Sequence, residues 1–352
     1  MGRHCNLSFF AVLILLCVCV SCGNRDEQDG PMEFRVEHVG RKMQSAWVDS
    51  IRTMVVTVPM DVPIAHVTDM DVAGGRCFVL DVLNRVFCVD TAQGRVIQCG
   101  VSLGHAGNEM LSPACLTADD EHVYVYDSMK SQIFVLTHNL QLHHVLDVGC
   151  SFGTFRKVDG GFACLSLGKE QSFHFLRDDG VVTYSRKLSD IYPSTIFGDH
   201  PIQLGGDGAV YVKAVYSNTI YRWDGKELSV AYKFDFDDGG VDDTQSRTGG
   251  QVMKSGEKFL IDYYVTRSHV LASYYGTREG DDKDAVMQCL ASRFTRQSVT
   301  GWTGYVDGTV IVPSVQHGRY SYAVAFPDDF SPCRDKRSEL NCVMLIRYEW
   351  PE

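Results

Sequence analysis

The sequence predicts an all-β protein, a six-bladed β-propeller built from four-stranded antiparallel blades. One observation is a recurring pair of β-rich runs spaced roughly 40 to 50 residues apart, which is the period of a propeller blade. A second is the alternation of apolar and polar residues within these runs, which glycine-containing turns separate. A third is the lack of convincing amphipathic helical patterns. About six units of this size fit between residues 45 and 352.

The repeat is clearest in four copies along the first two thirds of the chain. Each copy has a run of β-branched and aromatic residues, a polar turn and a second such run. The first runs are Phe78–Asp81, Tyr124–Asp127, Gly161–Leu165 and Ala209–Val212. Asp81 and Asp127 stand at the same position of the repeat, where an aspartate carboxylate can accept backbone N–H groups two residues on. We therefore expect these two residues to hold turns.

The two ends of the chain predict how the ring closes. Ser50–Val58 is a strand-like run ahead of the first copy, and Asn341–Tyr348 is the last such run in the sequence. Propellers commonly pair their two chain ends in one blade, which removes exposed strand edges. We expect these two runs to share the sixth blade.

The N-terminus predicts export. The apolar run Leu7–Val20 has the length of a signal peptide and is short for a bilayer span. It ends in Ser21-Cys22-Gly23, which resembles the lipobox of bacterial lipoproteins and implies lipidation of Cys22. We expect a signal peptide over residues 1–21, a lipidated tether over 22–44 and the propeller over 45–352. This predicts an outer-membrane lipoprotein of undetermined facing side; a conventionally cleaved signal or a single-span anchor is the alternative.

The charge and the cysteine content of the chain argue against two classes of function, nucleic-acid binding and structural zinc binding. The chain has 33 Lys and Arg against 44 Asp and Glu, a net charge of −11, so it lacks the basic face that nucleic acids require. Of its 13 cysteines, three lie in the predicted signal peptide and Cys22 is the predicted lipid attachment site; none of the remaining nine forms a CxxC pair, which argues against a structural zinc site. Cys77 and Cys88 fall on adjacent pairs of a predicted hairpin and so should face opposite sides. Cys333 and Cys342 form the plausible disulfide.

Several segments carry a resemblance to known families. Asp127–Val135 looks like the core of an NHL repeat, and the chain as a whole resembles the six-bladed β-propeller lipoproteins of gut-type Gram-negative bacteria. Their recurrent glycine-rich loop corresponds to Gly104–Glu109, and further matching segments are Asn218–Arg222 and Asn341–Ile346. The resemblance implies a candidate ligand-facing loop that contains His105, Asn108 and Glu109.

Catalytic and metal-binding motifs are weak. The sequence contains no hydrolase elbow, phosphate-binding loop or dinucleotide fingerprint, and its histidines have no recognisable metal spacing. Asp237–Asp243 and Glu279–Asp284 are acidic loops, which we interpret as solvated, with calcium binding as the alternative. Six-bladed hydrolases such as gluconolactonase-like enzymes place Glu, Asn and Asp around a central metal. Glu109, Asn218 and Asp207 supply those residue types.

The sequence therefore favours a protein that binds without catalysing a reaction and needs no cofactor. Trp302, Tyr305 and Tyr320 are candidate recognition aromatics in the segment that departs most from the blade rhythm. We expect a monomer held at the membrane by its lipid, with an envelope protein or a glycan as partner and no nucleic acid. The alternative is a calcium-dependent lactonase or glycan-active hydrolase that uses the central channel.

Overall fold

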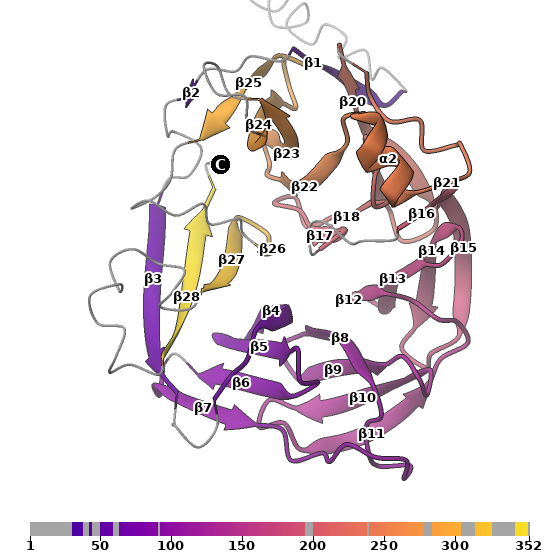
Figure 1. Ribbon diagram of the computed structural model, residues 1–352. Coiled ribbons are helices and arrows are strands. Elements are labelled where there is room, and N and C mark those ends of the chain that lie inside the picture. The colour runs from indigo at the N-terminus through magenta and orange to yellow at the C-terminus, as the bar shows by residue number, and fades with distance from the viewer. Residues whose placement is uncertain are drawn as a thin grey trace, which may run out of the picture. The chain divides into compact units, whose positions relative to one another are not determined.

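A computed structural model places all of the described sheets in one body that spans Met32–Glu352. Figure 1 shows the sheets arranged around a common centre, with the strands of each sheet following one another outward. Among the described residues, no helix is long and apolar enough to cross a bilayer. The described residues are 30–37, 42–43, 50–58, 63–90, 92–193, 200–237, 239–277, 284–303, 314–325 and 342–350.

Blades 1, 2 and 3 are four-stranded antiparallel sheets of consecutive strands. Blade 1 contains β4 (Val67–Ala73), β5 (Arg76–Asp81), β6 (Val86–Asp90) and β7 (Arg95–Gln98). Blade 2 contains β8 (Pro113–Ala118), β9 (His122–Asp127), β10 (Gln132–Thr137) and β11 (Leu142–Asp147). Blade 3 contains β12 (Thr154–Val158), β13 (Gly161–Leu167), β14 (Gln171–Arg177) and β15 (Val182–Ser189).

Blades 4, 5 and 6 each pair their outer edge with a strand from the N-terminal part of the chain: β3 (Ser50–Thr57) completes blade 6, and two further strands, described below, are added to blades 4 and 5. Blade 4 contains β17 (Ile202–Leu204), β18 (Val210–Lys213), β19 (Thr219–Trp223) and β20 (Leu228–Phe236). Blade 5 contains β22 (Leu260–Val265), β23 (His269–Thr277), β24 (Asp284–Ser292) and β25 (Ser298–Thr303). Blade 6 contains β26 (Val315–His317), β27 (Tyr320–Ala325), β28 (Cys342–Glu349) and β3 (Ser50–Thr57). Blades 4 and 6 are joined through one parallel pair, Leu204 with His317.

An N-terminal strand, β3, and the last described strand, β28, meet in blade 6. β3 pairs antiparallel with β28 over eight residues, from Ser50 opposite Glu349 to Thr57 opposite Cys342. These are the two runs that the sequence places in one blade.

Two further N-terminal strands extend the sheets beyond the predicted blade pattern. β1 (Met32–Val36) pairs in parallel with β20 on the outside of blade 4, and β2 (Lys42–Met43) pairs in parallel with β25 on the outside of blade 5. The buried side chain of Phe34 packs between Tyr232 and Phe234. The sheets thus begin inside the segment 22–44 that the sequence predicts to be a tether.

The core lies between neighbouring blades, because alternate side chains of each strand point to the two faces of a sheet. Phe78 and Cys88 pack toward blade 2, whereas Cys77 and Phe87 pack toward blade 6. The register pairs Cys77 with Val89 and Phe78 with Cys88, so the two cysteines occupy adjacent pairs and opposite faces as the hairpin prediction requires. Both thiols are free.

One described helix interrupts the β-rich pattern. α2 (Gly249–Ser255) begins after Thr248, whose hydroxyl accepts a hydrogen bond from the backbone N–H of Gln251, while the Gln251 side chain accepts one from Thr248 N. A helix this short has too few turns to show an apolar period in sequence. The strand β21 (Arg247–Thr248) just before it pairs in parallel with β16 (Ile191–Tyr192).

Candidate functional site

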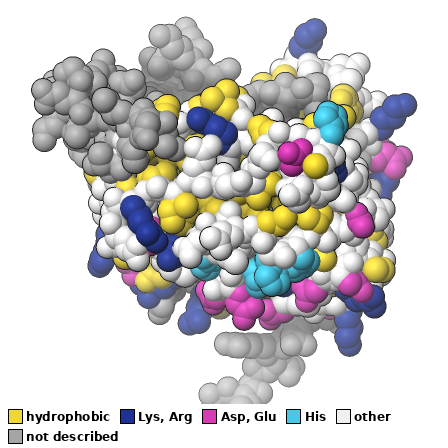
Figure 2. All heavy atoms as spheres, turned by 90° about the horizontal axis from the view of Figure 1, so that it is seen from below, with side chains coloured by type: hydrophobic (Ala, Val, Ile, Leu, Met, Phe, Trp, Pro, Cys, Tyr) yellow, Lys and Arg dark blue, Asp and Glu magenta, His cyan; other side chains and the backbone are white. Residues whose placement is uncertain are grey.

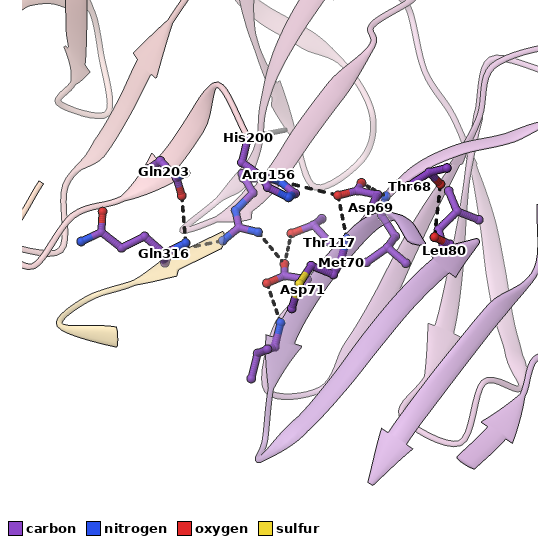
Figure 3. A network of polar contacts seen from close by, with 12 residues as sticks. Thr68, Asp69, Met70, Asp71, Leu80, Thr117, Arg156, His200, Gln203 and Gln316 are labelled. Carbon is purple, nitrogen blue, oxygen red and sulfur yellow. Dashed lines mark hydrogen bonds and ion pairs between the residues drawn. The ribbon is translucent and has the colours of Figure 1, made fainter. Parts of the chain in front are cut away.

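The innermost strands β4, β8, β12 and β22 end their sheets, so one edge of each lacks a neighbouring strand. Polar side chains supply partners for these edges (Figure 3). The carboxylates of Asp69 and Asp71, on β4, accept hydrogen bonds from the N–H groups of Leu116 and Ala118, each at 2.8 Å. Since Leu116 and Ala118 belong to β8, side chains of blade 1 satisfy the free edge of blade 2.

The same arrangement continues around the centre. Thr117 Oγ1 accepts a hydrogen bond from Lys157 N of β12 at 3.1 Å, and Gln203 Oε1 accepts one from Gln316 N at 2.9 Å. The Gln316 amide accepts from Val265 N at 3.0 Å and donates to Val265 O at 2.8 Å. A side-chain amide therefore takes the place of one rung of a β-ladder on β22.

An ion pair fixes the middle of this network. The Arg156 guanidinium lies 3.0 Å from the Asp71 carboxylate, and the two side chains are 2% and 0% exposed. His317 Nε2 lies 2.5 Å from the same carboxylate, and Arg156 also donates to Gln316 O at 3.3 Å. Burial alone would raise the pKa of Asp71, but Arg156 and His317 outweigh it and lower that pKa below its usual range. Asp71 is therefore a fixed anion.

The pKa of the neighbouring carboxyl, that of Asp69, shifts in the opposite direction. Burial raises the pKa of Asp69 to about 7, because its hydrogen bonds from Leu116 and Met70 only partly offset the loss of water. Burial and then the Arg156 charge lower the pKa of His200, whose Nδ1 lies 3.6 Å from Asp69, to about 3. The imidazole of His200 is thus neutral at pH 7.

We call the polar side chains that cap the inner strands, together with Arg156, His200 and His317, the central network. Its carboxylates are bonded by backbone groups and by Arg156 and His317, which suits a role in holding the blades together. Three buried atoms of this network, Arg156 Nε, His200 Nε2 and Gln203 Nε2, have no hydrogen-bond partner in the described part of the chain. Buried groups of this kind usually bind ordered water.

Sequence reasoning missed the central network. The signal was present in β4, where Asp69 and Asp71 sit at alternate positions of an otherwise apolar inner strand. Two carboxylates at such positions are costly to bury unless they are bonded. Their partners lie in other blades, so sequence spacing could not identify Arg156 or Gln316.

The residues proposed for a hydrolase do not converge. Asp207 lies in the turn before β18 and Asn218 lies in the loop after it, so the two stand at opposite ends of that strand. Glu109 lies in the loop that joins blades 1 and 2. Asp207 accepts hydrogen bonds from Tyr211 and Arg293, and Asn218 donates to a backbone oxygen, so each has a local partner.

The described carboxylates of the acidic loops bind different protein groups and do not converge on one point. In the first loop, Asp237 pairs with Arg35 at 2.7 Å, whereas Asp243 accepts a hydrogen bond from the Ser217 hydroxyl. The second loop, Glu279–Asp284, lies outside the described residues except for Asp284. Among all described residues, no group of three His, Cys, Asp or Glu side chains is arranged to hold a metal ion.

The predicted ligand-facing loop is organised by one of its own residues. The Glu109 carboxylate accepts hydrogen bonds from Ala106 N at 3.0 Å and from the Ser102 hydroxyl at 3.2 Å. The same carboxylate lies where a Cβ atom on Gly104 would stand, so a larger residue there would require the Glu109 side chain to move. His105 and Asn108 are exposed. In this loop, Glu109 is a structural residue and the other two face solvent.

Asp81 and Asp127 hold the turns that follow their strands. Asp81 Oδ1 accepts from Leu83 N and Arg85 N, each at 3.0 Å. Asp127 Oδ1 accepts from Met129 N and Lys130 N, each at 3.1 Å. Similar hydrogen bonds at equivalent places of two blades, each including the N–H two residues on, are what a repeated turn requires.

The remaining predicted residues are only partly described. Tyr320 begins β27, where the guanidinium groups of Arg319 and Arg347 lie over its ring. Trp302 lies on β25, and Cys342 begins β28, without a description of either side chain. Cys22, Tyr305 and Cys333 lie outside the described residues.

A pocket of about 560 Å³ lies where the turns of blades 2, 3 and 4 meet. The pocket is formed by the turn between the first and second strands of each of these blades, together with the β19–β20 turn of blade 4. The loop containing Glu109 precedes β8, so it lies at the opposite end of that strand from the pocket. The side chains of Asp159 and Arg222 have no polar partner among the described residues. Charged and aromatic lining residues are Asp119, Asp159, Asp207, Asp224, Lys157, Arg222 and Trp223.

The fold and its centre define the class of this protein. It is a β-propeller whose inner strands are tied together by polar side chains. The sequence matches the model of a family described as 6-bladed beta-propeller over residues 41–278, and the chain belongs to that family. No curated protein matches the sequence.

Solved structures show the same fold at low sequence identity. A protein of Bacteroides fragilis, described as a putative exported protein, is 13% identical with a TM-score of 0.64, over 91% of this chain and 99% of that one. A member of a family of unknown function (DUF4221) from Bacteroides vulgatus is 7% identical with a TM-score of 0.52, over 85% of this chain and 96% of that one.

Proposed function

We propose that this protein is an envelope lipoprotein whose propeller binds a polar ligand without catalysing a reaction. The observation that carries the proposal is the pocket at the turns of blades 2, 3 and 4, which offers ligand-binding groups of both signs beside an indole ring. The exported description of the Bacteroides fragilis neighbour supports a place outside the cytoplasm.

The pocket favours a neutral ligand rich in hydroxyl groups. Its lining has four aspartates and two basic residues, so it offers both hydrogen-bond acceptors and donors, and a ligand of one charge would match only one of these two kinds of group. A hydroxyl group can both donate and accept a hydrogen bond, so it can bind the acidic and the basic side chains alike. We therefore propose a glycan rather than an envelope protein as the ligand of this pocket.

The central network argues against the hydrolase alternative. Its ionised carboxylate, Asp71, is buried and accepts hydrogen bonds from backbone groups, so no part of it is left to bind substrate. The residues that a gluconolactonase-like site would need, Glu109, Asn218 and Asp207, lie apart.

Binding to an array of neutral and charged glycans tests the proposed ligand class. We expect saturable binding of a neutral glycan that Asp224→Ala and Arg222→Ala each weaken by about tenfold. Lys226→Ala is the matched control, because Lys226 is an exposed neighbour that does not line the pocket. A lack of binding to every neutral glycan, or unchanged binding by both pocket variants, would contradict the proposal.

The anchor has a separate test. Cys22→Ser removes the thiol that the lipobox-like segment implies is acylated. We expect this variant to leave the outer-membrane fraction and appear in the soluble fraction, since acyl chains contribute about 0.8 kcal/mol of membrane affinity per buried CH₂ group. If it stays in the membrane fraction, the lipid anchor at Cys22 is wrong.

A further inference from the structure

The outer strand of blade 2 carries an irregular pair of histidines. In the register of β10 and β11, Val135 lies opposite His144, but Leu136 lies opposite Leu142, so His143 is an extra residue in a β-bulge. Consecutive side chains on a regular strand point to opposite faces. Here the bulge brings His143 Nδ1 and His144 Nδ1 to 2.6 Å from each other. The sequence pattern alone predicts the opposite, that the two rings diverge.

Two imidazole nitrogens at this distance share a single proton. A neutral imidazole has one N–H and one lone pair, so one ring donates and the other accepts. Zinc binds imidazole nitrogen at about 2.0 to 2.1 Å, and a tetrahedral angle between two such bonds separates the nitrogens by about 3.3 Å. Since both side chains are exposed, a rotation that adds less than about 1 Å brings both lone pairs onto one ion.

The surroundings of the pair suit a cation. The centroids of His143 and His144 are 4.8 Å apart, and those of His122 and His143 are 5.0 Å apart. Glu121 places a carboxylate 4.0 Å from His122 Nδ1. Figure 2 shows histidine side chains gathered beside acidic ones on the face viewed from below the orientation of Figure 1.

We propose that His143 and His144 form a two-histidine site for a divalent late transition metal ion such as Zn²⁺. Because no three candidate side chains among the described residues are arranged around one ion, water completes the coordination. The site lies on the outer rim of blade 2 and is independent of the glycan proposal.

Calorimetric titration of the purified full-length mature protein with Zn²⁺ tests the site. We expect His143→Ala and His144→Ala each to lower the affinity of one Zn²⁺ site by about tenfold or more. His105→Ala is the matched control, since His105 is an exposed histidine in a loop at some distance along the chain, and it should leave the affinity unchanged. Cysteines are the same in all variants, so thiol binding cannot produce the difference.

Two further results make the outcome decisive. The thermal midpoint of the metal-free variants should match that of the parent protein, because both side chains are exposed. Zn²⁺ should then raise the midpoint of the parent protein and of His105→Ala but not that of the double variant His143→Ala/His144→Ala. Equal Zn²⁺ affinity in the parent and the double variant overturns the proposal, as does a parent protein that binds no Zn²⁺.

Discussion

The inner and outer edges of this propeller face the same physical problem and solve it differently. Every strand at the end of a sheet has backbone N–H and C=O groups that need partners. At the centre, side chains such as Asp71 and Gln316 provide them. At the rim of blades 4 and 5, the N-terminal strands β1 and β2 provide them. The comparison teaches that the inner strands, which lie close together at the centre, are capped by side chains of neighbouring blades. The outer strands of blades 4 and 5 instead pair with an added strand.

The largest expected effect is at the inner edge. Arg156→Met removes the cation that faces Asp71 and leaves a buried carboxylate without its charge partner. We expect a loss of about 4 kcal/mol in the free energy of unfolding, measured by chemical denaturation. The double variant Arg156→Met/Asp71→Asn should recover part of this loss, because it carries no unpaired charge. If the double variant is no more stable than the single one, charge is not what makes Arg156 important.

Substitution at the outer edge of blade 4, where the added strand β1 packs on the blade, should lower stability nearly as much. Phe34 is 0% exposed and packs with Tyr232 and Phe234. We expect Phe34→Ala to lower the free energy of unfolding by about 3 kcal/mol, since it leaves a cavity between β1 and blade 4. Arg35→Ala, on the exposed side of the same strand, is the control and should change stability little. Equal effects of the two substitutions would mean that β1 contributes through its backbone alone.

A pH dependence distinguishes the two carboxyls of the inner edge. The pKa of Asp69 is raised to about 7, so its contribution to stability is full below the unfolded pKa near 4 and is lost as the pH rises through 7. Asp69→Asn lacks this loss. From pH 5 to pH 8 the variant should therefore gain about 2 kcal/mol relative to the parent protein. Chemical denaturation at both pH values measures it, and a constant difference between the proteins would refute the raised pKa.

The smallest effect is expected on the outer strand of blade 6, which has no added strand in the described structure. Val55 of β3 is 56% exposed. We expect Val55→Lys to change the free energy of unfolding by no more than about 0.5 kcal/mol. Thermal denaturation with Val56→Lys alongside provides the contrast, since Val56 is 3% exposed and its substitution should be strongly destabilising. Similar results for the two would show that this edge is covered.

The sequence predicted the blades better than it predicted the site. The runs around Phe78 and Tyr124 became the second strands of blades 1 and 2, because alternation and turn residues are local properties of the chain. The central network depends on contacts between residues such as Asp71 and His317, which are 246 positions apart. No local pattern encodes such a pair. The bulge at His143 was missed for a related reason, because register is a property of two strands.

The N-terminal strands have a consequence for how the chain folds. Arg35 bonds to Asp237 across 202 positions and to Ser298 across 263, and Ser50 bonds to Glu349 across 299. Contacts this distant in sequence slow folding, because a large loop must close before they form. A chain that emerges N-terminus first therefore holds β1 and β3 unpaired until blades 4 and 6 exist. The earliest strands to be made are thus paired late, β1 once β20 is present and β3 only when β28, the last strand, is present.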